Sequence, residues 1–172
     1  DGSPYRFTGL NIYNANSNGL CWYAMDGTVL ADSLTAIGPG KNAFRAWFFQ
    51  ALATQSGARD WSAFDRTLAT ASARGLRVIA TLSDQYGECG DGGINGFKPR
   101  GWYVSGYTQT DPGLLVPYRD WVTEVVTRYQ DDPTILAWQL INEAEVTEVL
   151  PGGAHAACPQ GTNEPADILK AW

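Results

Sequence analysis

Apolar and polar positions along the chain follow two periods, one typical of strands and one typical of helices. Four short segments are almost wholly apolar and end at polar residues, which predicts strands at 7–13, 42–49, 76–82 and 135–141. Between them, apolar residues recur every three or four positions in the segments 29–37, 62–74 and 117–129. This spacing predicts three amphipathic helices that alternate with the strands.

Each predicted helix collects its apolar residues on one face. The faces consist of Leu30, Leu34 and Ile37; of Phe64, Leu68 and Ala71; and of Tyr118, Trp121, Val122, Val125 and Val126. Apolar strands that alternate with such helices are typical of a parallel α/β sheet covered by helices. A doubly wound sheet fits this order too, but the chain has neither a GxGxxG nor a GxxxxGK[ST] pattern, so nucleotide binding has no support.

Polar and aromatic residues stand at the carboxyl ends of all four predicted strands. In parallel α/β folds these ends converge and form the ligand site. The set comprises Asn11, Tyr13 and Asn14; Arg45 and Trp47; Asp84, Gln85 and Tyr86; and Asn142, Glu143 and Glu145. We therefore expect these residues to gather at one edge of the sheet.

Arg45 and Glu143 each have an ordinary structural interpretation beside the functional one. Strand alternation places Arg45 and Trp47 on one face of their strand, away from the helices. An arginine there needs an anion, and a structural ion pair with a core carboxylate would satisfy it. A glutamate just past a strand is equally compatible with a helix cap or a solvated position.

Composition narrows the class of protein and of partner. The 172 residues, 44% apolar and 17% charged, match one globular domain. A net charge of −6 with scattered lysines and arginines argues against nucleic-acid and anionic-membrane partners. No stretch approaches the roughly 20 apolar residues of a membrane span, and the start, DGSPYRF, lacks the pattern of a signal peptide, so we expect a soluble, already processed chain.

The cysteines and the histidine predict no metal site. Cys21, Cys89 and Cys158 share no CxxC spacing, and His155 has no HxxxH partner. Each cysteine lies in a Gly- or Pro-rich loop, which favours one disulfide and an oxidising, extracellular compartment, with one cysteine left over. One pairing, Cys89 with Cys158, would staple together the long loops 83–113 and 146–163.

The combined pattern resembles glycoside hydrolase family five, the retaining (β/α)8-barrel glycosidases of the endo-mannanase and cellulase type. The resemblance rests on FTGLNIY, FRAWFF, ARGLRVIATLSD and YRDWVTEVVTRYQDDPTILAWQLINEAE, of which RYQDDPTI before an apolar strand ending in Asn-Glu is the most specific. It implies a TIM barrel of which residues 1–172 supply about the first four βα units, a β-linked oligo- or polysaccharide as substrate, and no cofactor. It does not choose between mannan, cellulose and related β-glycans.

The resemblance also implies roles for three residues. Glu143 would be the general acid and base, Asn142 would hydrogen-bond the sugar 2-hydroxyl, and Arg45 would orient the nucleophilic carboxylate. Retention requires two carboxyl groups roughly 5 to 5.5 Å apart, one donating a proton to the leaving oxygen. Because partial burial favours the protonated form of a carboxylic acid, we expect Glu143 to be half-buried.

Aromatic and polar residues near the strand ends are candidates for substrate contacts, because sugar rings stack their C–H faces on aromatic rings. The candidates are Trp47 and Trp102 first, then Tyr13, Asn14, Asp84, Tyr86 and Glu145. Each aromatic residue has an alternative role in packing loops onto the barrel.

Four βα units are half of an eight-unit barrel, which usually takes about 250 residues. In the family that the chain resembles, the nucleophilic glutamate belongs to the seventh strand, so we expect the same or a second chain to supply it with the C-terminal half. The last residues, DILKAW, read as part of a fourth helix, so we expect a portion of a larger enzyme. Two alternatives remain, a non-catalytic carbohydrate-binding α/β domain and an inactive half-barrel fragment.

Overall fold

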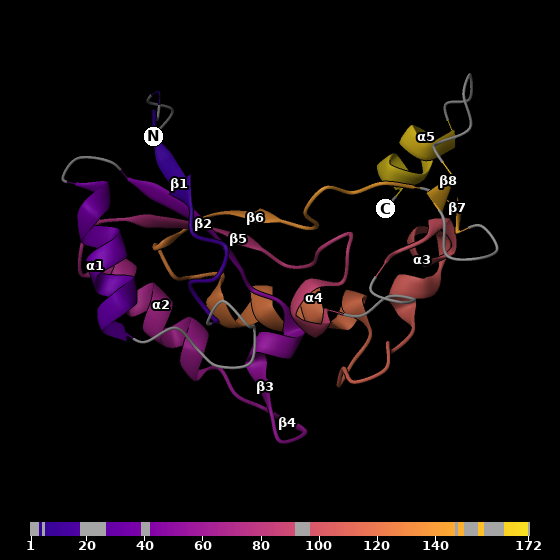
Figure 1. Ribbon diagram of the computed structural model, residues 1–172, viewed down its shortest axis with the longest axis horizontal. Coiled ribbons are helices and arrows are strands. Elements are labelled where there is room, and N and C mark those ends of the chain that lie inside the picture. The colour runs from indigo at the N-terminus through magenta and orange to yellow at the C-terminus, as the bar shows by residue number, and fades with distance from the viewer. Residues whose placement is uncertain are drawn as a thin grey trace.

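A parallel four-stranded sheet forms the centre of the molecule (Figure 1). The computed structural model describes residues 4, 6–17, 27–38, 42–91, 97–146, 148–149, 155–156 and 164–171. The strands are β1 (Gly9–Asn11), β2 (Ala43–Trp47), β5 (Arg77–Thr81) and β6 (Ile135–Gln139). They lie side by side in the order in which they occur along the chain, so β1 and β6 are the two edges of the sheet.

The strand register brings the carboxyl ends of the strands to one edge. Asn11 pairs with Arg45 between β1 and β2, and Trp47 pairs with Thr81 between β2 and β5. Thr81 in turn pairs with Gln139, after a register shift earlier in β5 and β6. A separate parallel bridge between Asp84 and Asn142 continues this pairing beyond the ends of β5 and β6.

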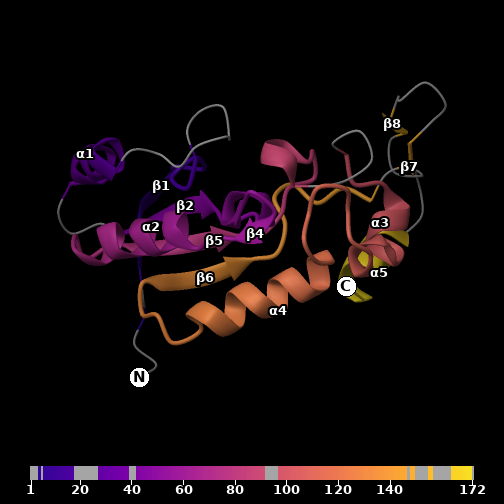
Figure 2. The same ribbon diagram turned by 90° about the horizontal axis from the view of Figure 1, so that it is seen from below.

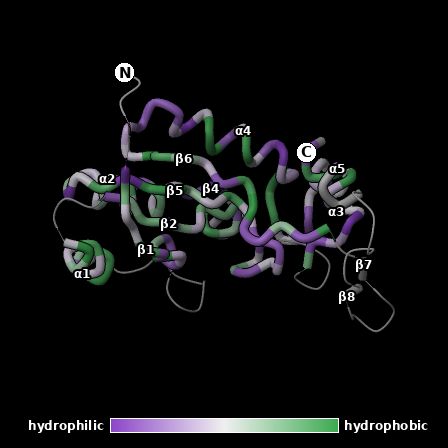
Figure 3. The backbone as a smooth tube through the Cα atoms, turned by 90° about the horizontal axis from the view of Figure 1, so that it is seen from above, coloured by the Kyte–Doolittle hydropathy of each residue, from purple (hydrophilic) through white to green (hydrophobic). Residues whose placement is uncertain are grey.

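Three helices cover one face of the sheet, and the described residues place no helix on the other face beside the strands (Figures 1 and 2). These helices are α1 (Gly27–Ile37), α2 (Ser62–Ser72) and α4 (Tyr118–Tyr129). Figure 3 shows α4 changing between hydrophobic and hydrophilic along its turns, as an amphipathic helix at the surface does. The helices therefore form an outer layer and leave the opposite face of the sheet open.

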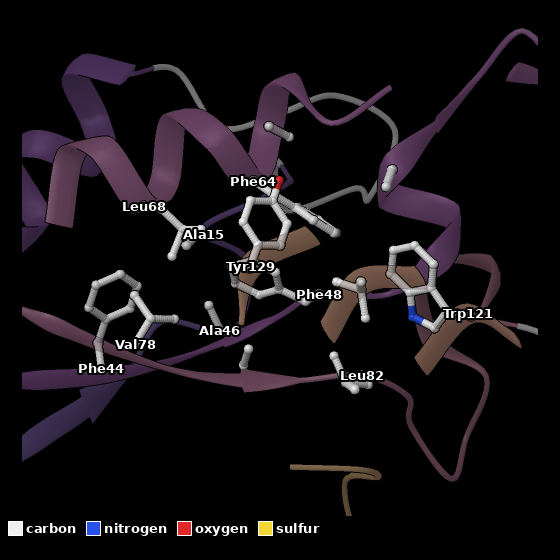
Figure 4. Packing of buried hydrophobic residues seen from close by; sticks show 14 of the residues in the cluster. Ala15, Phe44, Ala46, Phe48, Phe64, Leu68, Val78, Leu82, Trp121 and Tyr129 are labelled. Atoms are coloured by element: carbon white, nitrogen blue, oxygen red, sulfur yellow. The ribbon is translucent and has the colours of Figure 1, made fainter. Parts of the chain in front are cut away.

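The core lies between the strands and these helices (Figure 4). Phe44, Ala46 and Phe48 from the β2 segment are fully buried and pack with Phe64 of α2 and Trp121 of α4. Burying a side chain of this size stabilises the fold by about 1.5 to 3 kcal/mol relative to leaving it exposed. The three predicted helix faces are confirmed, because each carries residues of this cluster.

The predicted strands and helices are confirmed in type and order, with strands two to four residues shorter than predicted. The interpretation of 83–113 and 146–163 as long loops is wrong in part. The first contains two short 3-10 turns, η2 (Glu88–Gly90) and η3 (Gly106–Thr108), and the helix α3 (Arg100–Val104). The second contains the paired two-residue strands β7 (Glu148–Val149) and β8 (His155–Ala156).

The remaining elements are small or peripheral. A 3-10 turn, η1 (Gln50–Ala53), and the hairpin of β3 (Thr54–Gln55) with β4 (Ala58–Arg59) connect β2 to α2. The helix α5 (Glu164–Ala171) agrees with the fourth helix expected from the sequence. None of the helices in the described ranges combines the length and the apolar character needed to cross a membrane.

Candidate functional site

A chain of hydrogen bonds joins the ends of all four strands on the open face of the sheet. It runs from Asn11, the last residue of β1, through Arg45 of β2 to Gln139 of β6, and from Arg45 to Asn142 and Asp84. The prediction that polar residues of the four strand ends gather at one edge is therefore confirmed for Asn11, Arg45, Asp84 and Asn142. This network is the candidate site.

Arg45 stands at the centre of the network and is held by amide oxygens. Its acceptors are Gln139 Oε1 from Nε (2.6 Å), Asn11 Oδ1 from Nη1 (3.1 Å) and Asn142 Oδ1 from Nη2 (2.7 Å). Burial lowers the pKa of the guanidinium, and the negative charges of Asp84 and Glu143 oppose this effect. No described carboxylate forms an ion pair with Arg45, so the structural ion pair considered from the sequence is absent from this part of the chain.

Gln139 is a site residue that the sequence analysis missed. Its Oε1 accepts from Arg45 Nε and, at 2.8 Å, from Thr81 Oγ1, so it links β2, β5 and β6 across the sheet. A lone glutamine in the apolar run ILAWQLI was the available signal. Because a buried amide oxygen needs a donor, such a glutamine indicates a polar partner on the same face of the sheet.

Asp84 has a different position from the one predicted for a substrate-binding residue. It is 1% exposed, and both carboxylate oxygens accept hydrogen bonds within the protein. Oδ1 accepts from Asn142 Nδ2 at 2.8 Å, and Oδ2 accepts from the backbone N–H groups of Tyr86 (3.1 Å) and Glu88 (3.3 Å). Asp84 therefore orients Asn142, and its role as a substrate-binding residue stays a prediction.

Glu143 and Glu145 follow Asn142 and are both exposed, so the expectation of a half-buried Glu143 is wrong for the described residues. Glu143 adopts a left-handed backbone conformation, with φ of 52°. A non-glycine residue in that region costs on the order of 1 kcal/mol and persists only where neighbouring contacts hold it. This strained turn directs Glu143 away from the path that a regular strand would follow.

Two tyrosines provide the exposed aromatic surface near the network. Tyr13 is 43% exposed, and its ring centroid lies 4.6 Å from that of Trp47, which is 9% exposed and stacks on Phe49 behind it. Tyr86 is 41% exposed and meets Phe97 edge to face. The pKa of Tyr86 is raised, first by partial burial and then by the charges of Glu145, Glu143 and Asp84.

Trp102 packs in the interior, and its role as a sugar platform stays a prediction. It lies in α3, is 5% exposed, and packs against the rings of Tyr103, Tyr107 and Tyr118. All tryptophans whose side chains the structure describes are buried or half-buried. Within the described ranges, the exposed rings near the network are therefore those of Tyr13 and Tyr86.

The other predicted residues are only partly described. Asn14 lies in the turn after β1, is half-buried, and its carbonyl accepts from Ser17 N–H at 3.0 Å. Cys158 lies outside the described residues, so its predicted pairing with Cys89 stays a prediction. Within the described ranges, no three His, Cys, Asp or Glu side chains are grouped so that they could hold a metal ion.

Comparison with known proteins gives consistent relatives, although no family model matches the chain. The chain is 32% identical to mannan endo-1,4-beta-mannosidase 1 of Oryza sativa subsp. japonica over 88% of its own length and 40% of that protein. It is 28% identical to a probable mannan endo-1,4-beta-mannosidase C of Aspergillus terreus over 72% of its own length and 30% of that protein. The chain thus spans less than half the length of these curated relatives.

A solved structure shows the same fold over the whole chain. The endo-1,4-beta-mannanase from Rhizomucor miehei superimposes with a TM-score of 0.61 and 19% identity, covering 100% of this chain and 52% of that one. Structural neighbours of this type are (β/α)8 barrels, and this chain matches about half of one. The four parallel strands with their outer helices are therefore part of a (β/α)8 barrel, as the resemblance to family five implied.

Proposed function

The chain belongs to glycoside hydrolase family five, and from this we propose that it supplies the acid and base half of a retaining glycosidase acting on β-linked glycans. Mannan is the first substrate to test, because the curated relatives named above are mannan endo-1,4-beta-mannosidases. Cellulose and related β-glycans are the next candidates. Residues 1–172 would form the N-terminal half of the catalytic barrel.

The hydrogen bonds that hold the Arg45 guanidinium are the observation that carries the proposal. A guanidinium has five N–H donors, and the bonds to three amide oxygens use three of them. Neutral amides fix the position of Arg45 without neutralising its charge. An arginine prepared in this way has two N–H groups for a further acceptor, and a carboxylate is the acceptor that matches them best.

The proposed reaction uses Glu143 and a second carboxylate outside this sequence. Glu143 donates its proton to the glycosidic oxygen while the second carboxylate bonds to the anomeric carbon and the leaving sugar departs. The Glu143 carboxylate then takes a proton from water, whose oxygen displaces the second carboxylate with a second inversion. Arg45 keeps the second carboxylate ionised, because its positive charge lowers the pKa of a neighbouring acid.

Asn142 and the residues around it would bind the sugar. The amide of Asn142 is fixed by Asp84 and Arg45, which leaves one N–H and one lone pair for a sugar hydroxyl. Tyr13 with Trp47, and Tyr86, present aromatic surface on which sugar rings can stack. Asn14 and Glu145 are candidates for further hydroxyl contacts.

The remaining partners and the compartment are part of the same proposal. The other half of the barrel, in the same or a second chain, would cover the edge strands β1 and β6. We propose an extracellular enzyme, on the loop positions of the cysteines. Cys89 is disulfide-bonded, which supports one disulfide. A pairing with Cys158 predicts that reduction loosens the two segments that it joins.

The experiment that tests the proposal is the substitution Glu143→Gln in the full-length protein. We expect β-mannan turnover to fall by roughly 10²- to 10⁴-fold, which is the usual contribution of a general acid and base. Binding of manno-oligosaccharides and the melting temperature should stay close to those of the parent, because the side chain is exposed. Glu88→Gln is the matched control, an exposed glutamate after β5, and it should retain full turnover.

The alternatives give different results in the same experiment. A non-catalytic carbohydrate-binding domain would bind the oligosaccharide without any turnover in the parent protein. An inactive half-barrel would show neither binding nor turnover. A structural role for Glu143 would lower the melting temperature and leave the turnover of the folded protein unchanged.

A further inference from the structure

A buried ion pair between Lys98 and Asp91 lies directly behind the candidate site and is not used by the proposed reaction. The side chains are 1% and 2% exposed, and Lys98 Nζ lies 3.0 Å from Asp91 Oδ2. The ammonium also donates to the carbonyls of Asp84 (2.5 Å) and Asp91 (3.3 Å) and lies 5.3 Å from the centroid of the Trp102 ring. Burying the lysine charge costs desolvation free energy, even with every donor occupied. An apolar residue at this position would not have that cost.

The ion pair forms hydrogen bonds with both the N–H and the carbonyl of Asp84. Asp91 Oδ2 accepts the N–H of Asp84 at 2.6 Å and the hydroxyl of Ser83 at 2.7 Å, while Lys98 donates to the carbonyl of Asp84. Both polar groups of this peptide segment are therefore bound to the ion pair. The carboxylate of Asp84 accepts a hydrogen bond from Asn142, so the position of the Asn142 amide depends on the bonds between Asp84 and the ion pair.

The direction of the Asn142 amide follows from the charge of Asp84. An ionised carboxylate only accepts hydrogen bonds, so the NH2 group of Asn142 must face Asp84 and its oxygen must face the donor Arg45. If Asp84 were displaced, its carboxylate would no longer fix the orientation of the Asn142 amide. The amide would then be free to rotate and present the wrong atom to Arg45 and to a bound sugar.

The same segment holds the turn that carries Glu143. Gln85 is 0% exposed; its N–H donates to the carbonyl of Asn142 at 3.1 Å, and its Oε1 accepts the N–H of Glu145 at 3.2 Å. Glu143 lies between these two bonds in its left-handed conformation. Gln85 is itself fixed by the backbone of Lys98, through Gln85 Nε2 to the Lys98 carbonyl (2.8 Å) and Lys98 N–H to the Gln85 carbonyl (2.9 Å). The ion pair acts on Gln85 indirectly, because the buried Lys98 side chain and its bond to Asp91 hold that backbone in place.

We propose that the Lys98–Asp91 pair is a positioning device for Asn142 and Glu143, acting through Asp84 and Gln85. The inference rests on the proposed function, because it takes Asn142 and Glu143 as the working residues. Neither member of the pair contacts the substrate. Their effect is to hold two side chains of the site in one geometry.

The test compares Asp91→Asn and Lys98→Met with the parent in the full-length protein, at a temperature at which all are folded. We expect kcat on β-mannan to fall by about 10- to 100-fold with KM within about threefold, because misplacement of catalytic groups by a fraction of an ångström acts on the transition state. Lys98→Met is the second variant because it conserves volume and leaves Asp91 able to bind a proton. Unchanged kcat in both folded variants would overturn the proposal.

Glu124→Gln is the matched control for lost stability. Glu124 is half-buried and pairs at 2.7 Å with Arg59, whose guanidinium lies over the rings of Trp61 and Trp121, and none of its described hydrogen bonds reaches the site network. It should lower the melting temperature as the test variants do and leave kcat within about twofold of the parent. An equal loss of kcat in Glu124→Gln would show that instability alone explains the effect, and would overturn the proposal.

A second measurement separates failure of this proposal from failure of the proposed function. The side-chain NH2 resonances of Asn142, assigned by ¹⁵N NMR, report the orientation of the amide without any turnover. They should move in Asp91→Asn and Lys98→Met and stay in place in Glu124→Gln, even if the parent hydrolyses no glycan. Resonances that stay in place in all three variants would exclude the positioning role.

Discussion

The two faces of β2 and its extension, residues 43–49, differ in character: one is apolar and the other carries a hydrogen-bonded arginine. Phe44, Ala46 and Phe48 point toward the helices and are fully buried in the core. Arg45 and Trp47 point to the open face, where Arg45 binds amide oxygens from β1, β6 and the residues beyond β6. Strand alternation alone produces this division.

The difference between the faces lies in what each requires of its neighbours. The helix face requires volume, because apolar contacts are not directional and similar shapes replace one another at a small cost. The open face requires geometry, because each hydrogen bond depends on a donor and an acceptor at a fixed place. Changes on the helix face should therefore alter stability, and changes on the open face should alter activity.

The largest expected effect breaks the helix face alone. Phe48→Ala should destabilise the full-length protein by about 3 to 5 kcal/mol, because it leaves a cavity beside Phe64. Urea unfolding measures the loss, and kcat of the folded fraction should stay within twofold. Val29→Ala, at a 53% exposed position on α1, is the control and should change stability by less than about 0.5 kcal/mol. An equal effect of the two substitutions would contradict the assigned core.

The next effect is a dependence of stability on pH that arises from the buried carboxyl group of Asp91. Burial raises the pKa of Asp91 from 3.8 to about 6, against the opposing charge of Lys98. The folded state thus holds this proton more tightly than the unfolded state, so the stability that protonated Asp91 provides is present below about pH 4 and lost by about pH 6.

This loss should amount to about 3 kcal/mol, since one pKa unit corresponds to roughly 1.4 kcal/mol. Unfolding free energies of the parent and Asp91→Asn, measured from pH 4 to pH 7, isolate it, because Asp91→Asn cannot bind the proton. The parent should lose stability relative to the variant as the pH rises. Parallel curves would show that Asp91 does not titrate in this range.

A smaller effect separates charge from geometry at Arg45. Arg45→Lys keeps the positive charge but loses the planar fork that reaches three amide oxygens, so we expect kcat to fall by about 10- to 100-fold, or about 2 kcal/mol. Steady-state hydrolysis of β-mannan measures this loss. Arg77→Lys, at the exposed start of β5, is the control and should leave kcat unchanged. Full activity of Arg45→Lys would mean that only the charge matters.

The smallest effect tests the aromatic edge of the open face. Tyr86→Ala removes a 41% exposed ring, so we expect KM for manno-oligosaccharides to rise by about three- to tenfold with kcat little changed. Trp102→Phe should leave KM unchanged and lower the melting temperature, because Trp102 packs in the interior. A raised KM in Trp102→Phe with an unchanged KM in Tyr86→Ala would show that Trp102, and not Tyr86, contacts the substrate.

The sequence was sufficient for the order of strands and helices and for the placement of Arg45 and Asn142. The first depends on periodicity, which acts locally along the chain, and the second on the general rule that parallel strands end at one edge of the sheet. The resemblance to family five added the barrel. The strand bounds were too long because apolar residues such as Phe48 and Leu82 continue the pattern past the last paired residue.

The interior of the segment 83–113 was beyond what the sequence could predict. Lys98 and Asp91 are the residue types that usually remain in solvent, and only the folded chain shows that they meet in the interior. The burial of Trp102 was out of reach for a related reason, because α3 is a short helix without a long periodic pattern. Asp84 was placed correctly at a strand end, but its burial depends on Asn142, 58 residues further on.

The measurement that tests the central claim most directly is the anomeric configuration of the first product. The full-length protein is mixed with a β-linked manno-oligosaccharide, and ¹H NMR follows the new reducing end before mutarotation. If Glu143 is the acid and base of a double displacement, the β-anomer appears first and the α-anomer grows in later. Initial release of the α-anomer would show inversion and contradict the two-carboxylate retaining mechanism proposed for this chain.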